Sequence, residues 1–175
     1  MRRISSKHGR ILGAGAAALA TLGLSAALAS QATSAVVPAC ATSGLVVWLD
    51  TQGNGAAGSS FYTLNFTNLS GHTCSLRGYP GISAVDLAGH RIGSPAGRDS
   101  GGGAGRLVTL RSGHAASATL RIVDALNFPN SRCRLTSAAG LRVYPPNQTA
   151  SKVVPFPFDA CARTGTVYLS IRSVQ

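Results

Sequence analysis

One set of side chains in this sequence has the types and the order that nucleophilic catalysis uses. The tetrapeptide Asp99-Ser100-Gly101-Gly102 could form a turn that presents a serine nucleophile, and His72 and Asp86 precede it. A serine nucleophile needs a base within hydrogen-bonding reach and a third group that orients the base. The tetrapeptide lies in a glycine-rich stretch, where such a match arises from composition alone. We therefore expect no catalytic residue in this chain.

The remaining candidates for acid–base or metal chemistry are sparse. The chain has five acidic residues, all Asp, whereas glycoside hydrolysis needs two carboxylates placed across one bond. Several Asp and His residues adjoin expected turns, where Asp commonly bonds the backbone: Asp50, Asp86, Asp159, His72, His90 and His114. No His shows the short spacing of a metal-binding motif, and the glycines near residues 101–105 lack the Gly-Lys-Ser/Thr of a phosphate loop. We expect no metal ion and no cofactor.

Four cysteines form the strongest chemical signal. They are Cys40, Cys74, Cys133 and Cys161, and the closest two are 28 residues apart, which is too far for a clustered zinc motif. In an exported chain they predict two disulfides. Three pairings are open, and spacing does not choose among them; we carry forward Cys40–Cys74 with Cys133–Cys161. Each such bridge would stabilise the fold by about 3–4 kcal/mol. Lipidation of Cys40 is an alternative, although Pro38 fits a lipobox poorly.

The N-terminus predicts export. Residues 1–10 hold four basic residues and no acid, and residues 11–29 are uncharged and mostly Ala, Leu and Gly. This order is typical of a signal peptide covering residues 1–35, with cleavage after Ala29 or Ala35. An uncleaved membrane anchor and a twin-arginine route are the alternatives. Residues 36–175 would then be a single domain that is secreted or associated with the cell envelope.

Hydrophobic residues in this domain alternate with polar ones, the pattern of strands with one face in water. The alternating sets are Tyr62, Leu64 and Phe66; Ala118, Leu120 and Ile122; Leu141 and Val143; and Val167, Leu169 and Ile171. Further strands are expected at 45–49, 74–77, 82–87, 107–110 and 152–155. Residues 131–139 could hold one helical turn at most, and residues 93–105 should form a flexible loop. The pattern predicts an all-β, Ig-like antiparallel β-sandwich in preference to a closed barrel.

The charge is strongly positive. The whole chain carries +11, and residues 36–175 contain 12 Lys and Arg against 5 Asp. The arginines form no run and no aromatic residues are interleaved with them, so we expect no nucleic-acid binding. The charge is typical of a solvated basic surface; the binding alternative is attraction to anionic wall polymers or lipid headgroups.

The segment Thr73–Gly81 (TCSLRGYPG) follows Leu64–Asn68 (LNFTN), and Leu141–Pro146 (LRVYPP) lies between Cys133 and Cys161. The chain from Cys40 onward resembles a widespread actinobacterial secreted domain of unknown function with four cysteines and a Cys-x-Leu-x-Gly-Tyr-Pro core. The resemblance implies an Ig-like sandwich on exported or envelope-associated proteins, and it implies no catalytic residue. We read the Gly78-Tyr79-Pro80-Gly81 motif as structural: a tight turn with Tyr79 packed across a sheet end.

These observations predict a non-catalytic secreted or envelope-associated domain that acts as a binding or structural module. Its partner would be an anionic envelope polymer or another extracellular protein. A secreted protein-binding effector or protease inhibitor is the alternative, although residues 93–105 are too glycine-rich for a preorganised inhibitory loop. A hydrolase is the weaker alternative.

Overall fold

The computed structural model of the protein describes residues 36–103 and 105–175. The predicted signal peptide therefore lies outside the described residues. Three short 3-10 turns accompany the strands, at η1 (Thr42–Gly44), η2 (Ser100–Gly102) and η3 (Ala125–Asn127). The strands are β1 (Leu45–Ala56), β2 (Ser59–Asn68), β3 (Cys74–Leu76), β4 (Gly81–Val85), β5 (Arg91–Ile92), β6 (Gly97–Arg98), β7 (Val108–Leu110), β8 (Ala115–Val123), β9 (Leu135–Tyr144), β10 (Lys152–Cys161) and β11 (Leu169–Ile171).

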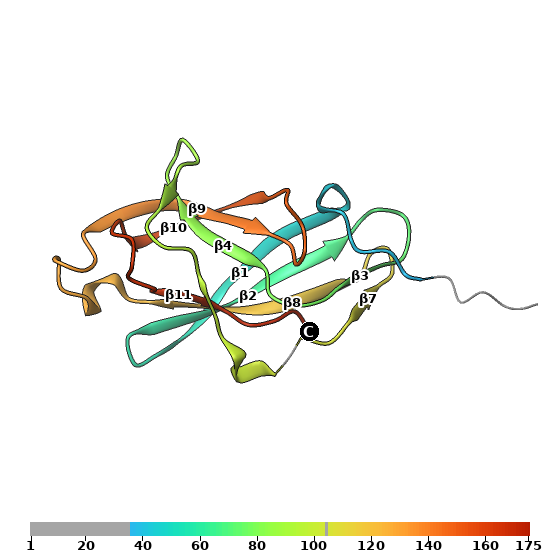
Figure 1. Cartoon of the computed structure of the whole chain (residues 1–175), viewed down its shortest axis with the longest axis horizontal. Coiled ribbons are helices and arrows are strands. Elements are labelled where there is room, and N and C mark those ends of the chain that lie inside the picture. The colour runs from blue at the N-terminus through green and yellow to red at the C-terminus, as the bar shows by residue number, and fades with distance from the viewer. Residues whose placement is uncertain (1–35, 104) are drawn as a thin grey trace, which may run out of the picture. The chain divides into compact units, whose positions relative to one another are not determined.

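Two sheets face each other and a smaller strand pair extends one end (Figure 1). The first sheet has the order β1-β2-β8-β11-β6 and the second has the order β10-β9-β4-β5, while β3 pairs with β7. The strands described pair antiparallel except β11 with β6, and an isolated parallel bridge joins Ala39 to Ser75. The predicted all-β class and two-disulfide sandwich are confirmed.

The alternating residues build the core, as predicted. On β2, Leu64 and Phe66 are buried, and they lie opposite the buried Ala118 and Ala116 of β8. From the second sheet, Leu141 of β9 contributes a fully buried side chain to the core. Because strand side chains alternate between faces, burial of this set sends the intervening polar residues into water. Aromatic contacts join the two sheets, with the Tyr62 and Phe156 rings 4.9 Å apart.

One expectation about local structure was wrong. The C-terminal strand spans only Leu169–Ile171, and Val167 is exposed whereas Tyr168 is buried. The alternation fails here because the Thr166 hydroxyl donates to the Arg132 carbonyl at 2.6 Å, which draws Thr166 inward. Residues 131–134 lie in a single turn, in which the Cys133 and Arg134 N–H groups donate to the Pro129 and Asn130 carbonyls, and β9 begins at Leu135. This is consistent with the expectation of at most one helical turn.

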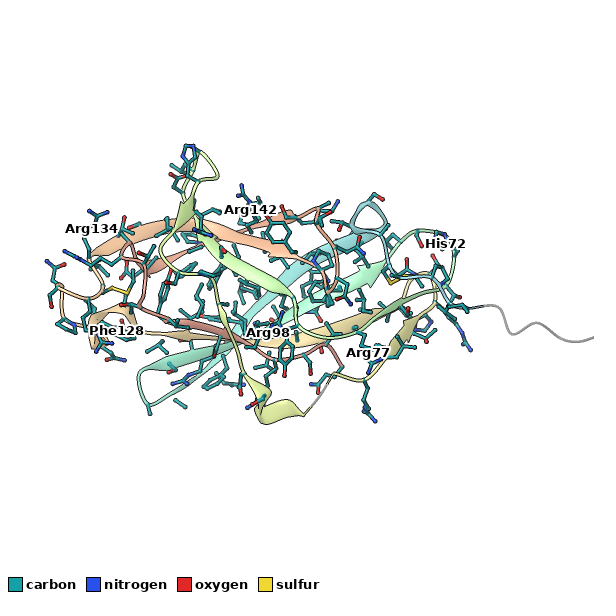
Figure 2. All side chains as sticks on the ribbon, in the orientation of Figure 1. His72, Arg77, Arg98, Phe128, Arg134 and Arg142 are labelled. Atoms are coloured by element: carbon teal, nitrogen blue, oxygen red, sulfur yellow. A yellow bond between two sulfur atoms is a disulfide. The ribbon has the colours of Figure 1, made fainter. Side chains whose placement is uncertain are left out.

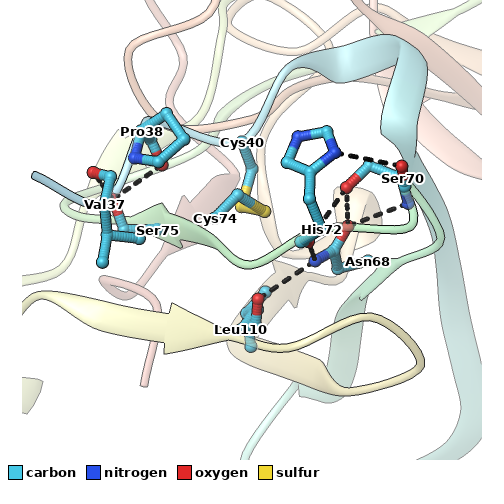
Figure 3. Close-up of a disulfide and its surroundings, with 9 residues drawn as sticks. All are labelled: Val37, Pro38, Cys40, Asn68, Ser70, His72, Cys74, Ser75 and Leu110. Carbon is cyan, nitrogen blue, oxygen red and sulfur yellow. Dashed lines mark hydrogen bonds between the residues drawn. A yellow bond between two sulfur atoms is a disulfide. The ribbon is translucent and has the colours of Figure 1, made fainter. Parts of the chain in front are cut away.

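A buried asparagine joins the loops beside the first disulfide (Figure 3). The side chain of Asn68 is fully buried. Its amide nitrogen donates to the carbonyls of His72 (2.8 Å) and Leu110 (3.0 Å). Its amide oxygen accepts from the backbone N–H and the hydroxyl of Ser70, at 3.0 and 2.7 Å. All four hydrogen-bonding positions of the amide group are therefore used. Any other side chain at this position would lose at least one of these hydrogen bonds.

We predict that Asn68→Asp lowers the free energy of unfolding by about 3 kcal/mol, because a carboxylate cannot donate to the two carbonyls that face it. Urea denaturation followed by circular dichroism measures the change. Asn65→Asp is the matched control: it adds the same charge three residues away on the water-facing side of β2 and should cost less than about 0.5 kcal/mol. An equal loss of stability in the two variants would contradict the role of Asn68 as a donor to two backbone carbonyls.

Candidate functional site

The residues whose order could suggest a catalytic triad make local bonds elsewhere. A ring nitrogen of His72 lies 3.1 Å from the Ser70 carbonyl oxygen. The Asp86 carboxylate accepts from the His90 backbone N–H at 2.7 Å, and its other oxygen lies 3.3 Å from the His90 ring nitrogen. In the described part of the chain, no hydrogen bond joins His72 to Asp86 or either of them to Ser100. The structure does not bring these residues together as a charge-relay set.

The aspartates also serve the backbone. Four of the five accept a nearby backbone N–H: Asp50 from Gln52, Asp86 from His90, Asp99 from Gly101 and Asp124 from Leu126. The His90 N–H lowers the pKa of Asp86, and the Gly101 N–H, helped by the Arg172 guanidinium, lowers the pKa of Asp99. Across residues 36–103 and 105–175, no three His, Cys, Asp or Glu side chains gather closely enough to hold a metal ion.

A hollow of about 510 Å³ lies between the turn after β4 and strand β9. It is lined mainly by small and apolar side chains, including the almost fully exposed Leu87. Asp86 supplies its one charge, and that carboxylate is already bonded to His90. The hollow therefore offers a surface for contact but no set of groups arranged for proton transfer.

Within the glycine-rich segment, residues 97–99 are tied to the sandwich at several points, whereas the sequence predicts a flexible loop over 93–105. Its strand β6 pairs with β11, with Gly97 opposite Ser170. The Arg98 guanidinium lies 5.5 Å from the centre of the Tyr79 ring, and the Asp99 carboxylate accepts from Arg172 at 3.0 Å. Glycine permits this course because it allows close backbone approach.

The Gly78–Gly81 motif connects β3 to β4, and three distant segments meet at its first residue. Gly78 has φ +101° and its carbonyl accepts from the Val174 N–H at 2.9 Å. Gly105 packs directly on it: a Cβ on Gly105 would lie 2.9 Å from the Gly78 Cα and 3.1 Å from the Ser173 Cβ. Pro80 is buried, and Gly81 begins β4 opposite Tyr144. Each residue of the motif thus has a local packing role in the structure.

Three arginines lie on neighbouring backbone segments at the end of the sandwich opposite β3 and β7. We call Arg132, Arg134 and Arg163 the arginine end; all three are exposed. The Arg163 N–H donates to the Cys133 carbonyl at 2.9 Å, and the Ala162 N–H donates to the Arg134 carbonyl at 3.0 Å. These bonds place Arg163 across from the pair that flanks Cys133. Figure 2 shows Arg134 and Arg77 toward opposite ends of the molecule.

A disulfide fixes the spacing of these arginines. Cys133 is bonded to Cys161, and Cys40 to Cys74. Cys133 lies between two of the arginines, and Cys161 is two residues before the third. Sequence reasoning missed this cluster because the arginines lie 29 or more residues apart across the two segments. Both Cys133 and Cys161 have an arginine within two residues in the sequence. Together with the Cys133–Cys161 pairing, this pattern could have predicted the arginine cluster.

The cluster is not neutralised within the domain. Among the described residues, Arg172 is the one arginine within ion-pairing distance of a carboxylate, that of Asp99. The acidic residues closest in sequence to the arginine end are Asp124 and Asp159. The Asp124 carboxylate accepts the Leu126 N–H and forms no ion pair with these arginines. The positive charge of the arginine end is therefore open to an external anion, and guanidinium groups bind phosphate and carboxylate oxygens in pairs.

The fold defines a disulfide-bonded all-β domain, and residues 36–175 contain 12 Lys and Arg against 5 Asp. The chain belongs to the DUF4232 family, described as a domain of unknown function, whose model matches residues 40–175. Comparison with curated proteins and with solved structures finds no match. Within the residues that the structure describes, no helix has the length and the hydropathy needed to cross a membrane.

We predict that Gly105→Ala destabilises the fold by about 1–3 kcal/mol, because the added methyl group meets the rigid backbone of Gly78. Thermal unfolding measures the effect. Gly102→Ala is the control, since its methyl group would meet only the flexible Arg172 side chain, at 3.4 Å. A Gly105 variant as stable as the Gly102 variant would show that the two segments do not touch.

The Asp99–Arg172 pair predicts a pH-dependent contribution to stability. The pKa of Asp99 is lowered from 3.8 in the folded state, so its stabilising effect is present above that value and is lost as the pH falls through the lowered pKa. Asp99→Asn should therefore reduce stability at pH 7, and the difference from the unmodified protein should shrink at pH 3. Urea midpoints at both pH values test this, and a difference that is equal at the two would contradict it.

Proposed function

We propose that this domain is a non-catalytic binding module of an exported, actinobacterial protein that contacts an anionic polymer of the cell envelope through its arginine end. Two disulfides support an extracytoplasmic location, because such bonds persist in oxidising compartments. The local bonding of His72, Asp86 and Asp99 supports a role other than catalysis. The single observation that carries the proposal is a set of three arginines on segments joined by a disulfide, with no carboxylate of residues 36–103 or 105–175 paired to them.

Preorganisation makes this cluster more effective than the same residues on a flexible chain. Arg134 has φ +50°, and the Arg132 carbonyl accepts the Thr166 hydroxyl at 2.6 Å, so the backbone on both sides of Cys133 is held in place. A fixed backbone keeps the three exposed side chains on neighbouring segments, so less entropy is lost when they gather on one ligand. A polymer with a phosphate on every repeat could occupy two or three of them at once, and the added attraction would fall with salt.

The test measures binding of the oxidised domain, residues 36–175, to a soluble poly(glycerol phosphate). We expect binding in 20 mM salt that weakens strongly in 500 mM salt. Replacing Arg132, Arg134 and Arg163 together with Gln should weaken it about tenfold or more. The control replaces Arg77, Arg106 and Arg111 with Gln, which removes the same charge from elsewhere and should change affinity much less.

Two outcomes would overturn the proposal. One is the absence of binding at low salt. The other is an equal loss in the two triple variants, because binding would then depend on net charge and not on the arginine end.

A further inference from the structure

The first sheet presents a broad surface to water, and its composition is unlike that of the arginine end. On β2, the buried Leu64 and Phe66 alternate with Thr63, Asn65 and Thr67, which therefore point away from the core. The register places Trp48 of β1 opposite Asn65. We call this surface the outer face; it comprises Val46, Trp48 and Asp50 of β1, Phe61, Thr63, Asn65 and Thr67 of β2, and Ser117, Thr119 and Arg121 of β8.

Trp48 is the most unusual residue of this face. It is the single tryptophan of the chain, and 46% of it is exposed. Its indole N–H donates to the Thr67 hydroxyl at 3.3 Å, a bond to the neighbouring strand that restrains the ring. Val46 lies two residues earlier on the same face and is equally exposed. A restrained aromatic ring in water offers an apolar plane to a ligand at little entropic cost.

The outer face carries one acidic and one basic side chain, and each has a hydrogen-bond partner within the domain. The Asp50 carboxylate accepts the Gln52 N–H, and the Arg121 guanidinium donates to the Ser59 hydroxyl at 3.0 and 3.1 Å. The Arg121 guanidinium also lies over the Phe61 ring, 5.9 Å from its centre. Between these two ends the cross-strand positions are uncharged hydroxyl and amide groups. The face therefore matches a neutral ligand better than an anionic one.

The chemistry of the surface selects among neutral ligands. A protein partner would call for a continuous apolar centre, whereas here the adjacent Val46 and Trp48 are separated from Phe61 by Thr63, Asn65 and Thr67. A sugar chain fits: each ring has a face of C–H groups that can stack on an indole, and a rim of hydroxyls that can bond to Thr63, Asn65 and Thr119. We propose that the outer face binds a neutral polysaccharide, with one sugar ring stacked on Trp48.

The single tryptophan makes the proposal directly testable. The probes are three neutral hexasaccharides, one each of β-1,4-linked N-acetylglucosamine, β-1,4-linked glucose and α-1,6-linked mannose, added to residues 36–175. We expect at least one of them to shift or quench the fluorescence of Trp48 saturably. Calorimetry should give the same affinity in 20 and 500 mM salt. No response to any of the three overturns the proposal.

Variants separate this site from the rest of the surface. Trp48→Ala should weaken binding of the responding hexasaccharide tenfold or more by calorimetry, and Trp48→Phe should retain part of it, because a smaller aromatic plane remains. Val153→Ala is the control, because Val153 is 55% exposed but lies on the second sheet. This variant should bind the hexasaccharide as tightly as the unmodified protein does. Equal affinity of Trp48→Ala and Val153→Ala would overturn the proposal.

The arginine-end triple variant distinguishes this proposal from the function proposed above. It should bind the hexasaccharide normally while losing affinity for poly(glycerol phosphate). A parallel loss of both ligands in that variant would place the sugar at the arginine end and overturn the assignment to the outer face.

Discussion

The pairing of β2 with β8 is the constraint on which the rest of this domain depends. The ladder runs from Ser59 opposite Val123 to Thr67 opposite Ala115 without a register shift. It turns Leu64 and Phe66 toward the second sheet and exposes Thr63 and Asn65 on the other side. A slip of one residue would exchange these two sets and bury the polar side chains. Core packing and the composition of the outer face are thus two results of a single register.

The ends of the sandwich are held by contacts between segments far apart in the chain. At one end Asn68 and the Cys40–Cys74 disulfide gather the loops around β3 and β7. At the other end the Cys133–Cys161 disulfide joins the start of β9 to the end of β10. Both bridges also lower the entropy of the unfolded chain, which a domain with many short strands needs. The same covalent bond that stabilises the second end sets the positions of its arginines.

The two proposed binding surfaces divide the polar groups of the domain by charge. The arginines at Arg132, Arg134 and Arg163 have no carboxylate paired with them in the described structure, so their field extends into solvent. On the outer face, Arg121 is bonded to Ser59, and Asp50 to the backbone of its own strand. An envelope contains both anionic and neutral polymers, and one domain with two unlike surfaces could hold one of each.

The sequence by itself determined the all-β class, the inward-facing residues of the central strands and the net charge. It could do so because two-residue periodicity, four cysteines and a lack of acids are local or compositional properties. Only the tertiary structure decided that Arg163 lies beside Arg132 and Arg134, that Gly105 meets Gly78, and that Tyr168 turns inward. These are long-range contacts that depend on which strands pair. Trp48 belongs to the same group, because its place beside Asn65 and Thr67 follows from the β1–β2 register and not from its neighbours in the chain.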